Sequence, residues 1–314
     1  MAQRRVTVFG GSGFVGRYVV SRLAARGDRV LVATRRPQEA LFLKPLGDVG
    51  QIQLIPANVR NEMSVARAVA GADCVINLIG ILHESGKQKF RTVQAEGAEN
   101  IAKAAKAAGV KSLIHVSAIG ADLDSASKYA RTKADGEHAI RSHFPAATIL
   151  RPSIIFGPED DFFNRFGTMA STFPALPLIA GKTRFQPVYV GDVADAVVRA
   201  TEDKALAGEL FELGGPKIYS FRELLDYILK ETLQDKPLVP VSMGLAKLKA
   251  FFLQILPNPP LTPDQVKLLQ SDNVVGDDAR TFADLGVRPK PVEAIVPAYL
   301  RRFRPKGQFS EKPI

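Results

Sequence analysis

Tyr129 and Lys133 are the residues whose types and spacing point most directly to chemistry. They stand four positions apart in a segment of helical periodicity, so both side chains are expected on one helix face. A nearby ammonium stabilises a phenolate and lowers the pKa of a tyrosine from about 10, which suits proton transfer during carbonyl reduction. Ser117, at the end of a predicted strand, is placed to hydrogen-bond the reacting oxygen. We interpret these three residues as a candidate catalytic triad.

A glycine-rich turn near the start of the sequence predicts a ligand for that chemistry. Gly10, Gly13 and Gly16 follow an apolar run and lead into a segment of helical periodicity. In such a strand–turn–helix unit the first glycine allows a sharp turn and the second lets backbone N–H groups approach a pyrophosphate. The third lets helix and strand pack closely. The spacing predicts a dinucleotide site, and the alternative is a turn whose glycines serve packing alone.

Three arginines bear on which dinucleotide is bound. An NAD site usually carries an acidic residue about 20 positions after the glycines, where it holds the ribose 2′-hydroxyl. Here the second predicted strand ends in Arg35 and Arg36, whose guanidinium groups suit a 2′-phosphate, and Arg17 adds a third positive charge. We expect NADPH as the cofactor. The alternative is that Arg35 and Arg36 are exposed loop charges.

Alternating strand and helix patterns in the first half of the chain position these residues. The alternation predicts a doubly wound parallel Rossmann sheet, an α/β fold that binds ligands at the carboxyl ends of its strands. The predicted strands are 5–9, 29–34, 52–56, 74–78, 112–117 and 147–150. The predicted helices are 16–26, 63–69, 93–108 and 129–142.

The pattern changes after Pro152, which indicates a smaller mixed C-terminal domain. Residues 156–166 are expected to form a loop that closes over the cofactor, and Asp192 is expected to N-cap a helix. We expect residues 1–155 to form the NADP(H)-binding domain, with its sheet completed by segments near 186–215. Residues 156–185 and 216–314 are expected to form the smaller substrate-like or docking domain.

Composition limits the class of protein. The 314 residues carry a formal net charge of +10, which is interpreted as a solvated basic surface or as a membrane-proximal or protein-docking face. No nucleic-acid motif accompanies this charge. Because no apolar run approaches ~20 residues and the first strand begins close to Met1, we expect neither a transmembrane helix nor a signal peptide. The single cysteine, Cys74, is expected to be buried and indicates a reducing compartment.

Together these motifs resemble the extended or atypical short-chain dehydrogenase/reductase superfamily over residues 1–215. The resemblance rests on the glycine turn, 77–80, 115–117, the Tyr129/Lys133 pair, 151–152 and 190–193. It implies a Rossmann domain with Ser117, Tyr129 and Lys133 as the active-site triad, and it implies that the tyrosine and lysine also contact the nicotinamide ribose. Two positions depart from the pattern, because Gln94 stands where active members usually carry Asn and Asn58 stands where an Asp often follows the third strand. The motif therefore supports cofactor binding more firmly than catalysis.

A short apolar and basic segment, 245–256, marks the C-terminal half. Its interpretations are a core helix with solvated lysines, a helix on a membrane surface, and a helix in a partner groove. Thr262 is expected to N-cap the next helix, with Pro263 at the first position and Gln265 completing a capping box. Residues 258–275, together with 81–84 and 127–134, resemble the nucleotide-binding accessory subunits of respiratory complex I (NADH:ubiquinone oxidoreductase) and their bacterial relatives. This resemblance extends over nearly the whole chain.

That resemblance implies an NADPH-binding accessory subunit whose tightly held nucleotide stabilises the fold rather than turning over. It implies docking to other complex I subunits on the peripheral arm near the quinone site. The expected location is the cytoplasmic face of a bacterial inner membrane, or the matrix side in a mitochondrion, with anionic lipid contact as a further expectation and no nucleic-acid partner. The alternatives are a soluble NADPH-dependent reductase or sugar-nucleotide epimerase, and a redox-sensing NADP-binding regulator. Whether the chain turns over a substrate by itself is left open, with a non-catalytic role favoured.

The motifs and the resemblance together define the expected site. His83 and Glu84 are expected to line the cofactor crevice, and no metal is expected, because no His, Cys or carboxylate cluster has metal-ligand spacing. The residues expected to hold the cofactor are Gly10, Ser12, Gly13, Phe14, Val15, Gly16, Arg17, Arg35, Arg36, Asn58, Val59, Leu78, Ile79, Gly80, Tyr129, Lys133, Pro152 and Ile154.

Overall fold

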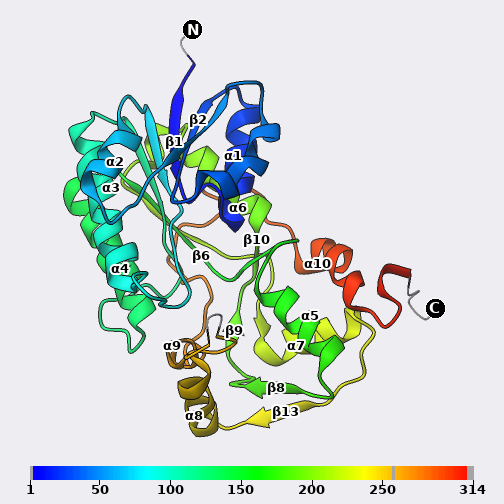
Figure 1. The fold of residues 1–314 in the computed structure, drawn as a ribbon. Helices are drawn as coiled ribbons and strands as arrows, with labels where there is room; N and C mark the ends of the chain where they lie inside the picture. Colours follow the sequence, from blue (N-terminus) through cyan, green and yellow to red (C-terminus); the bar gives the residue numbers. More distant parts are fainter. Residues whose placement is uncertain (1–2, 257–258, 310–314) are drawn as a thin grey trace. The chain divides into compact units, whose positions relative to one another are not determined.

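A computed structural model of the chain describes residues 3–256 and 259–309, which form two compact units (Figure 1). Unit 1 comprises Met1–Pro152, Val190–Leu213 and Asp277–Val287, and unit 2 comprises Ser153–Tyr189, Gly214–Gly276 and Arg288–Ile314. The outer ends of the predicted domains, residues 1–2 and 310–314, lie outside the described residues. Within the described ranges, no helix combines the length and the apolar character needed to cross a bilayer.

A seven-stranded parallel sheet forms the centre of unit 1. Its strand order is β11-β6-β5-β4-β1-β2-β3, so the chain winds outward from β1 in both directions. Val6, Val8 and Phe9 of β1 are fully buried, as is typical of parallel strands covered on both faces. The strands are β1 (Arg5–Phe9), β2 (Arg29–Thr34), β3 (Ile52–Pro56), β4 (Cys74–Asn77), β5 (Ser112–Val116), β6 (Thr148–Pro152) and β11 (Leu210–Leu213). The predicted doubly wound α/β fold is confirmed, and the predicted strands differ from these only by one or two residues at their ends.

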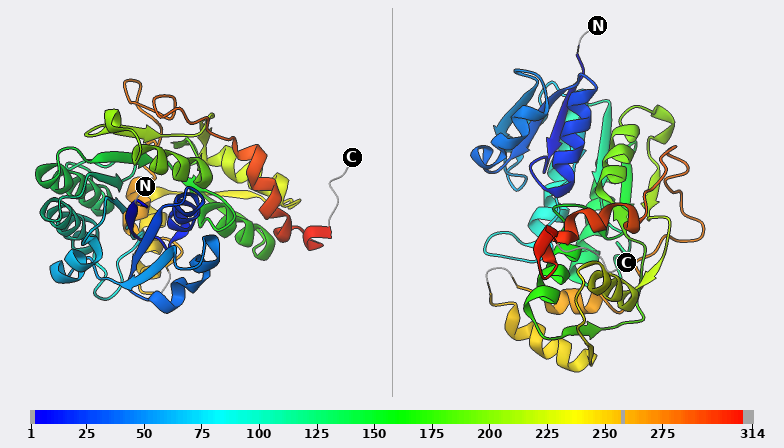
Figure 2. Two further views of the ribbon diagram at one scale, coloured as in Figure 1. Left: turned by 90° about the horizontal axis from the view of Figure 1, so that it is seen from above. Right: turned by 90° about the vertical axis from the view of Figure 1, so that its right-hand side faces the viewer.

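Helices cover both faces of this sheet. On one face α1 (Phe14–Ala25) packs against α6 (Val190–Ala200). On the other face α3 (Glu96–Ala107) lies between α2 (Glu62–Val69) and α4 (Lys128–His143), as the views of Figures 1 and 2 show. Short helices complete unit 1, namely η1 (Pro37–Leu46), η2 (Arg91–Ala95) and η3 (Lys204–Leu206). The free thiol of Cys74 is buried in β4, as predicted.

Two local predictions in unit 1 need correction. Asp192 is not a helix cap, because α6 already begins at Val190 and Asp192 lies buried in its first turn. The helix predicted from residue 93 begins earlier, as the π-helical turn η2 that continues directly into α3. Single π-helical turns often accompany functional sites, and this one carries Gln94.

Unit 2 is a mixed domain of short elements. Its strands form pairs rather than a sheet: β7 (Ile155–Phe156) with β10 (Val188–Tyr189), β9 (Arg184–Phe185) with β12 (Tyr219–Ser220), and β8 (Leu176–Ile179) with β13 (Leu238–Val241). Its helices are α5 (Phe162–Thr172), α7 (Phe221–Glu231), α8 (Met243–Leu253), α9 (Pro263–Leu268) and α10 (Val292–Leu300), followed by η4 (Arg301–Phe303) and η5 (Gly307–Phe309). The predicted cap of α9 is confirmed, because Thr262 and Gln265 form a capping box with Pro263 at the first position.

The loop predicted at 156–166 is wrong at both ends, because Phe156 belongs to β7 and α5 begins at Phe162. The aromatic residues of this segment build the core of unit 2 instead. Phe163 is fully buried, and the rings of Phe162 and Phe166 meet Phe221 edge-on, with centroids 6.1 and 5.6 Å apart. Aromatic clustering at helical spacing therefore outweighed the turn signals of the sequence.

Candidate nucleotide site

The glycine turn between β1 and α1 has the geometry of an anion cradle. Gly10 has a φ of +79°, which turns the chain sharply after β1, and its carbonyl accepts the N–H of Gly13 at 3.0 Å. A Cβ on Gly16 would lie 2.2 Å from that same carbonyl oxygen, so only glycine lets α1 pack this closely on the turn. α1 begins without a side-chain cap and without an acidic residue in its first turn. Its first N–H groups are therefore available to a phosphate.

The ends of two neighbouring strands meet this turn. At the end of β2, Thr34 Oγ1 lies 3.4 Å from Ser12 Oγ. After β4, the backbone of Leu78 lies 3.2 Å from the place that a Cβ on Gly10 would occupy, and Ile79 and Gly80 continue this segment. These groups lie at the carboxyl edge of the sheet, beside the reversal of strand order between β1 and β4. Doubly wound folds bind their ligands at this place.

The first turn of α1 supplies the remaining expected contacts of the glycine segment. Phe14 and Val15 have half-buried side chains, and the Phe14 ring meets Tyr18 edge-on with centroids 6.3 Å apart. The guanidinium of Arg17 lies 5.0 Å from the centroid of the Phe42 ring in η1. The positive charge of Arg17 is thus held beside the segment that follows β2.

Helix α4 positions the tyrosine and the lysine. The Ser127 hydroxyl accepts the N–H of Ala130 and caps α4, which places Tyr129 in the first turn and Lys133 one turn later. Lys133 is buried and its Nζ donates to the carbonyl of Val116, the last residue of β5, at 3.2 Å. Because Ser117 directly follows Val116 in the chain, this bond brings Lys133 beside Ser117. The structure therefore brings the lysine and the serine of the predicted triad to one strand end.

An ion pair holds α4 against the sheet. Arg151 of β6 donates from Nε and Nη2 to the two carboxylate oxygens of Glu137, at 2.9 and 2.7 Å. Both side chains are largely buried, and Glu212 of β11 lies 3.6 Å from the same guanidinium. Because Glu137 is one turn after Lys133, this bidentate contact fixes the height of the lysine above the sheet.

Burial sets the protonation states at this edge. It raises the pKa of Tyr129 to about 12 and lowers the pKa of Lys133 to about 8, because each charged form loses its hydration. The expectation that Lys133 lowers the pKa of Tyr129 is wrong in this structure, because desolvation governs the phenol and the ammonium is directed to the Val116 carbonyl. The Tyr129 phenol is therefore neutral near pH 7.

Two buried polar atoms beside Lys133 have no hydrogen-bond partner in the described part of the chain. They are Ser117 Oγ and Gln94 Oε1. A Cβ on Gly80 would lie 3.3 Å from Lys133 Nζ and 3.8 Å from Gln94 Oε1, so ammonium and amide oxygen converge on the space above this glycine. Buried polar groups are ordinarily paired. The orphaned atoms and the glycine cradle together fit a polar dinucleotide cofactor.

The two arginines after β2 differ in their surroundings. Both are exposed, and Arg36 Nη1 forms an ion pair with Glu39 at 2.9 Å while its backbone N–H donates to Thr34 Oγ1. Within the described chain Arg35 makes no ion pair. Of the two, Arg35 is therefore the side chain with its full charge available to an anion.

Other expected site residues have structural partners of their own. Asn58 Oδ1 accepts from the backbone and the side chain of Arg60, at 3.2 and 3.3 Å. Val59 is buried against Gly97 of α3, where an added Cβ would lie 2.9 Å from its methyl group. Asn58 therefore closes the turn after β3 with its own side chain.

The last expected residues lie after β4 and after β6. Glu84 Oε1 accepts the N–H of Phe90 at 2.9 Å, and His83 is half-buried. Pro152 ends β6, and its carbonyl accepts the N–H of Ile119. Ile154 belongs to unit 2, where its carbonyl accepts from Val188. Its role in holding a cofactor stays a prediction.

Sequence reasoning missed a buried pair next to this site. Asn77, the last residue of β4, and His115, the last but one of β5, are register partners, and Asn77 Nδ2 lies 3.0 Å from His115 Nδ1. Asn77 Oδ1 also accepts the N–H of Ile79, which shapes the segment facing the glycine turn. Burial and the Lys133 charge lower the pKa of His115 to about 3, so its ring is neutral. Two polar residues near the ends of two apolar predicted strands were the available signal.

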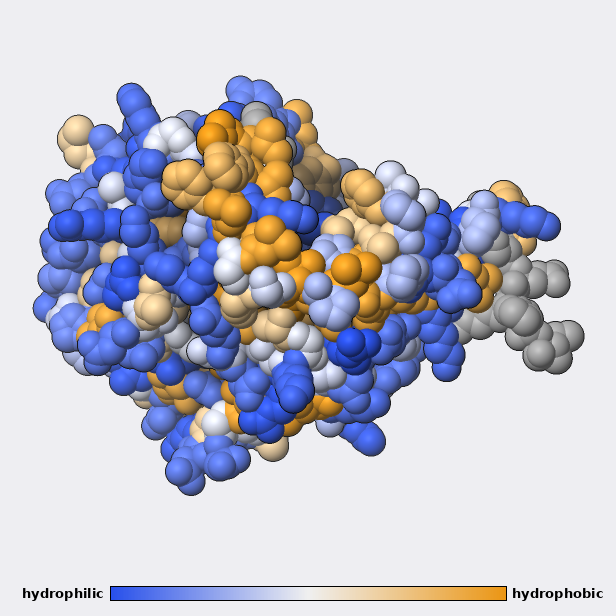
Figure 3. Space-filling model, turned by 90° about the horizontal axis from the view of Figure 1, so that it is seen from below, coloured by the Kyte–Doolittle hydropathy of each residue, from blue (hydrophilic) through white to orange (hydrophobic). Residues whose placement is uncertain are grey.

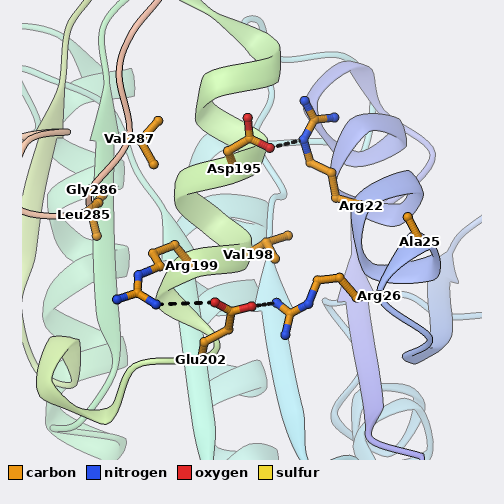
Figure 4. A pocket seen from close by; sticks show the side chains of 10 residues that line it. All are labelled: Arg22, Ala25, Arg26, Asp195, Val198, Arg199, Glu202, Leu285, Gly286 and Val287. Atoms are coloured by element: carbon orange, nitrogen blue, oxygen red, sulfur yellow. Dashed lines mark hydrogen bonds and ion pairs between the residues drawn. The ribbon is translucent and has the colours of Figure 1, made fainter.

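A second cavity of unit 1 has different chemistry. It has a volume of about 600 Å³ and lies at the C-terminal end of α1, against α6 (Figure 4). Its cations are neutralised in place, because Arg22 pairs with Asp195 and Glu202 pairs with both Arg26 and Arg199. Arg199 also pairs with Asp203 at 3.1 Å, so each of the three lining arginines is already engaged by a carboxylate. The candidate nucleotide site is at the glycine end of α1.

Comparison with known proteins places the chain in a family. The family model described as "NAD dependent epimerase/dehydratase family" matches residues 6–214. The NADH dehydrogenase [ubiquinone] 1 alpha subcomplex subunit 9 of Mus musculus is 38% identical over 302 residues, covering 95% of this chain and 80% of that protein. The protein of the same name from Arabidopsis thaliana is 36% identical over 315 residues, covering 96% of this chain and 78% of that protein.

A solved structure shares the fold. The NADPH-dependent quinone oxidoreductase QOR2 from Escherichia coli, complexed with NADPH, superposes with a TM-score of 0.75 at 19% identity and covers 94% of this chain and 99% of that one. At this identity the likeness concerns the fold alone. Because the family model matches two thirds of the chain and the mitochondrial relatives match nearly all of it, the chain belongs to the NAD dependent epimerase/dehydratase family.

Proposed function

We propose that this chain is an NADPH-holding accessory subunit of respiratory complex I, in which the nucleotide stabilises the fold rather than turning over. The observation that carries the proposal is the extent of the similarity to the subunit 9 proteins, which covers 95–96% of this chain at 36–38% identity. The family model ends at residue 214. Most of unit 2 lies beyond that point, so nucleotide binding alone does not account for the shared C-terminal part.

The residues of unit 1 define how the nucleotide is held. The turn from Gly10 to Gly16 receives the pyrophosphate, Lys133 and Tyr129 face the nicotinamide ribose, and Arg35 receives the 2′-phosphate, with Arg17 beside it. A ligand that binds only the native state stabilises it by about 4 kcal/mol at a thousandfold excess over its dissociation constant. A permanently held NADPH therefore keeps the carboxyl edge of the sheet ordered.

Unit 2 is the docking domain of this proposal. Its partners are other complex I subunits on the peripheral arm near the quinone site, at the membrane face on the cytoplasmic side in a bacterium or on the matrix side in a mitochondrion. Contact with anionic lipid belongs to the same location. The net charge of +10 suits that position, because the surface of such a membrane is negative.

Purification under native conditions tests this function. The chain is tagged in its own host, and mass spectrometry of the isolated assembly identifies partners and nucleotide together. We expect complex I subunits in the same particle and one NADPH per chain that survives dilution. Isolation of the chain as a free protein, with no complex I subunit, contradicts the accessory role.

A second candidate function rests on Lys133, whose Nζ donates to the Val116 carbonyl next to Ser117, and on Tyr129, one turn before Lys133 in α4. A bound nicotinamide supplies a hydride to a carbonyl carbon in reductases of this kind. Tyr129, neutral because its pKa is about 12, would donate a proton to the carbonyl oxygen while Ser117 hydrogen-bonds the same atom. The chain would then be an NADPH-dependent reductase or epimerase with its own substrate.

Replacement of the proton donor separates the two functions. Tyr129→Phe removes the hydroxyl and keeps the ring that packs on Phe90. If the chain is an enzyme, the variant loses a measurable turnover. If the chain is an accessory subunit, complex I activity remains near that of the original protein. Ser117→Ala serves as an independent check, because its hydroxyl has no other partner among the described residues.

A further inference from the structure

Helix α8 of unit 2 exposes its largest side chains and buries its smallest ones. Ala246 and Ala250, one helical turn apart, are buried and pack with Ile179 and Val266. Six large apolar residues of the helix and the turn after it are between 45% and 80% exposed. We call these residues the α8 patch: Leu245, Leu248, Phe251, Phe252, Ile255 and Leu256. In Figure 3 apolar side chains gather over α8.

This arrangement is the reverse of an ordinary surface helix, in which large apolar residues face the core. Exposure of several neighbouring large side chains is costly in water and marks an interaction site. Two aromatic rings add to the patch, since Phe251 and Phe252 meet edge-on with centroids 5.6 Å apart. The helix has 11 residues, about half the ~20 needed to span a bilayer. The patch is therefore suited to contact with another surface rather than to crossing a bilayer.

The charges within the chain segment that carries the patch are all positive. Lys247 and Lys249 are exposed on α8, and the sequence from 237 to 263 contains no Asp or Glu. An acidic partner surface complements such a helix. Apolar side chains beside lysines, without acidic residues, are typical of helices that lie in the interface of a negatively charged membrane.

A basic cavity adjoins the start of α8. It has a volume of about 740 Å³, and its lining includes Lys182, Arg184 and Arg222 together with Pro240 and Val241 of β13. Only Ser242 separates the end of β13 from the start of α8, so the cavity lies next to the helix along the chain. Within the described residues neither Lys182 nor Arg222 has an ion-pair partner, whereas Arg184 pairs with Asp272 at 2.8 Å.

The one carboxylate of the cavity is engaged elsewhere. Glu223 accepts from the backbone and the hydroxyl of Ser220, at 2.6 and 2.8 Å, in the capping box of α7. Contact with Ser220 lowers the pKa of Glu223, so the carboxylate stays ionised and bound to the cap. Lys182 and Arg222 therefore leave the cavity with a positive charge that suits a phosphate monoester or diester.

We propose that unit 2 docks on the surface of an anionic phospholipid membrane through the α8 patch, with lipid phosphates at Lys247 and Lys249 and in the cavity of Lys182 and Arg222. The apolar side chains enter the acyl boundary, and the cations meet the headgroups a few ångströms above it. The inference deepens the proposed function, since it gives a subunit placed near the membrane a lipid contact of its own. It is tested on the isolated full-length chain, so complex I assembly does not enter the result.

Flotation with lipid vesicles measures the contact. The probes are vesicles of phosphatidylcholine alone and vesicles of equal parts phosphatidylcholine and phosphatidylglycerol. We expect the NADPH-loaded chain to float with the anionic vesicles and at least tenfold less with the neutral ones. Added salt is expected to reduce the anionic binding, because it screens the headgroup charge.

Matched variants separate the patch from general stickiness. Leu248→Ser removes a side chain that is 56% exposed, and Leu123→Ser removes one in unit 1 that is 52% exposed. We expect at least a tenfold loss of binding in the first variant and no change in the second. The paired reversals Lys247→Glu with Lys249→Glu, and Lys182→Glu with Arg222→Glu, are each expected to weaken binding to anionic vesicles at least tenfold. Lys44→Glu with Lys106→Glu changes the net charge equally on unit 1 and is expected to have little effect.

Three results would overturn the proposal. The first is equal flotation with neutral and anionic vesicles. The second is the same loss in Leu123→Ser as in Leu248→Ser. The third is a chain that self-associates through the patch, which light scattering would report as a dimer that Leu248→Ser converts to a monomer. Because every substituted side chain is exposed, retained thermal unfolding of each variant confirms that the fold is intact. Loss of lipid binding in a chain that still assembles with complex I refutes this inference and leaves the proposed function standing.

Discussion

Gln94 Nε2 donates a hydrogen bond to Thr132 Oγ1 at 3.1 Å, which joins the π-helical turn η2 to the turn of α4 that lies between Tyr129 and Lys133. The other end of the same amide leaves Oε1 buried without a partner among the described residues. A Cβ on Gly136 would lie 2.6 Å from the Gln94 carbonyl, so η2 and α4 are in direct backbone contact here. Gln94 stands at the position where active members of the resembled superfamily usually carry Asn. Its side chain anchors α4 through the hydrogen bond to Thr132.

Gln94→Met is expected to weaken NADPH binding about tenfold while changing the free energy of unfolding of the nucleotide-free protein by only ~1 kcal/mol. The variant loses one hydrogen bond to Thr132 but also removes a buried amide oxygen that has no partner, and these effects oppose each other. Thr132→Val is the matched control, because it removes the same hydrogen bond and leaves Oε1 in place. Fluorescence titration with NADPH measures both, and equal dissociation constants for the two variants would show that Oε1 does not meet the nucleotide.

Gly16→Ala is expected to prevent formation of the nucleotide site. The added Cβ would lie 2.2 Å from the Gly10 carbonyl oxygen and 2.5 Å from Gly11 Cα, so α1 has to move away from the turn. We expect a loss of ~3 kcal/mol or more in the free energy of unfolding, together with loss of bound nucleotide. Gly244→Ala is the control, because no atom lies within 4 Å of its added Cβ and α8 gains up to ~1 kcal/mol from the better helix former. Denaturant unfolding measures the free energy of unfolding of both variants, and a Gly16→Ala variant as stable as Gly244→Ala would contradict the prediction.

Arg35→Ala is expected to raise the dissociation constant for NADPH by tenfold or more and to leave that for NADH nearly unchanged. The physical reason is the lost charge-assisted contact with the 2′-phosphate, which NADH lacks. Arg29→Ala, an exposed arginine at the opposite end of β2, changes the net charge equally and is expected to leave both constants unchanged. A parallel loss for NADH and NADPH in Arg35→Ala would remove the basis for the choice of NADPH.

Local backbone rules explain why much of this site is readable from the sequence. The positive φ of Gly10 and the close approach at Gly16 follow from glycine spacing within a few residues. The capping box at Thr262 is equally local. Predictions of this kind succeed because the atoms that decide them are covalently near one another.

Features that depend on contacts between segments far apart in the sequence were not predicted from local patterns. The Asn77–His115 pair requires the register of β4 against β5, and the orphaned Gln94 oxygen requires the packing of η2 on α4. The raised pKa of Tyr129 follows from the packing that desolvates its phenol, which the four-residue spacing to Lys133 does not encode. For α8, the sequence shows apolar and basic residues but not that alanines would face inward.

The buried ammonium of Lys133 is expected to make stability depend on pH. Burial lowers its pKa to about 8 in the folded chain from 10.5 when unfolded. The unfolded state therefore holds more protons between these values, and the free energy of unfolding of the nucleotide-free chain rises with pH across this window. Lys133→Met removes the buried charge, so the variant is expected to be more stable than the original chain at pH 7 by roughly 2–4 kcal/mol. The difference should shrink as pH rises from about 8 towards 10.5. Urea unfolding of both proteins over that range measures it, and a constant difference would mean that Lys133 does not titrate in the window.

Glu137→Gln is expected to destabilise the fold by ~3 kcal/mol or more, because it leaves the buried guanidinium of Arg151 without its bidentate partner. The matched control is Glu39→Gln, which breaks the exposed pair with Arg36 and is expected to cost less than ~1 kcal/mol. Since Glu137 lies one turn from Lys133, its loss is also expected to weaken NADPH binding by lifting α4 from β6. Thermal unfolding with and without NADPH separates the two effects. If Glu137→Gln and Glu39→Gln unfold at the same temperature, the ion pair does not hold α4 in place.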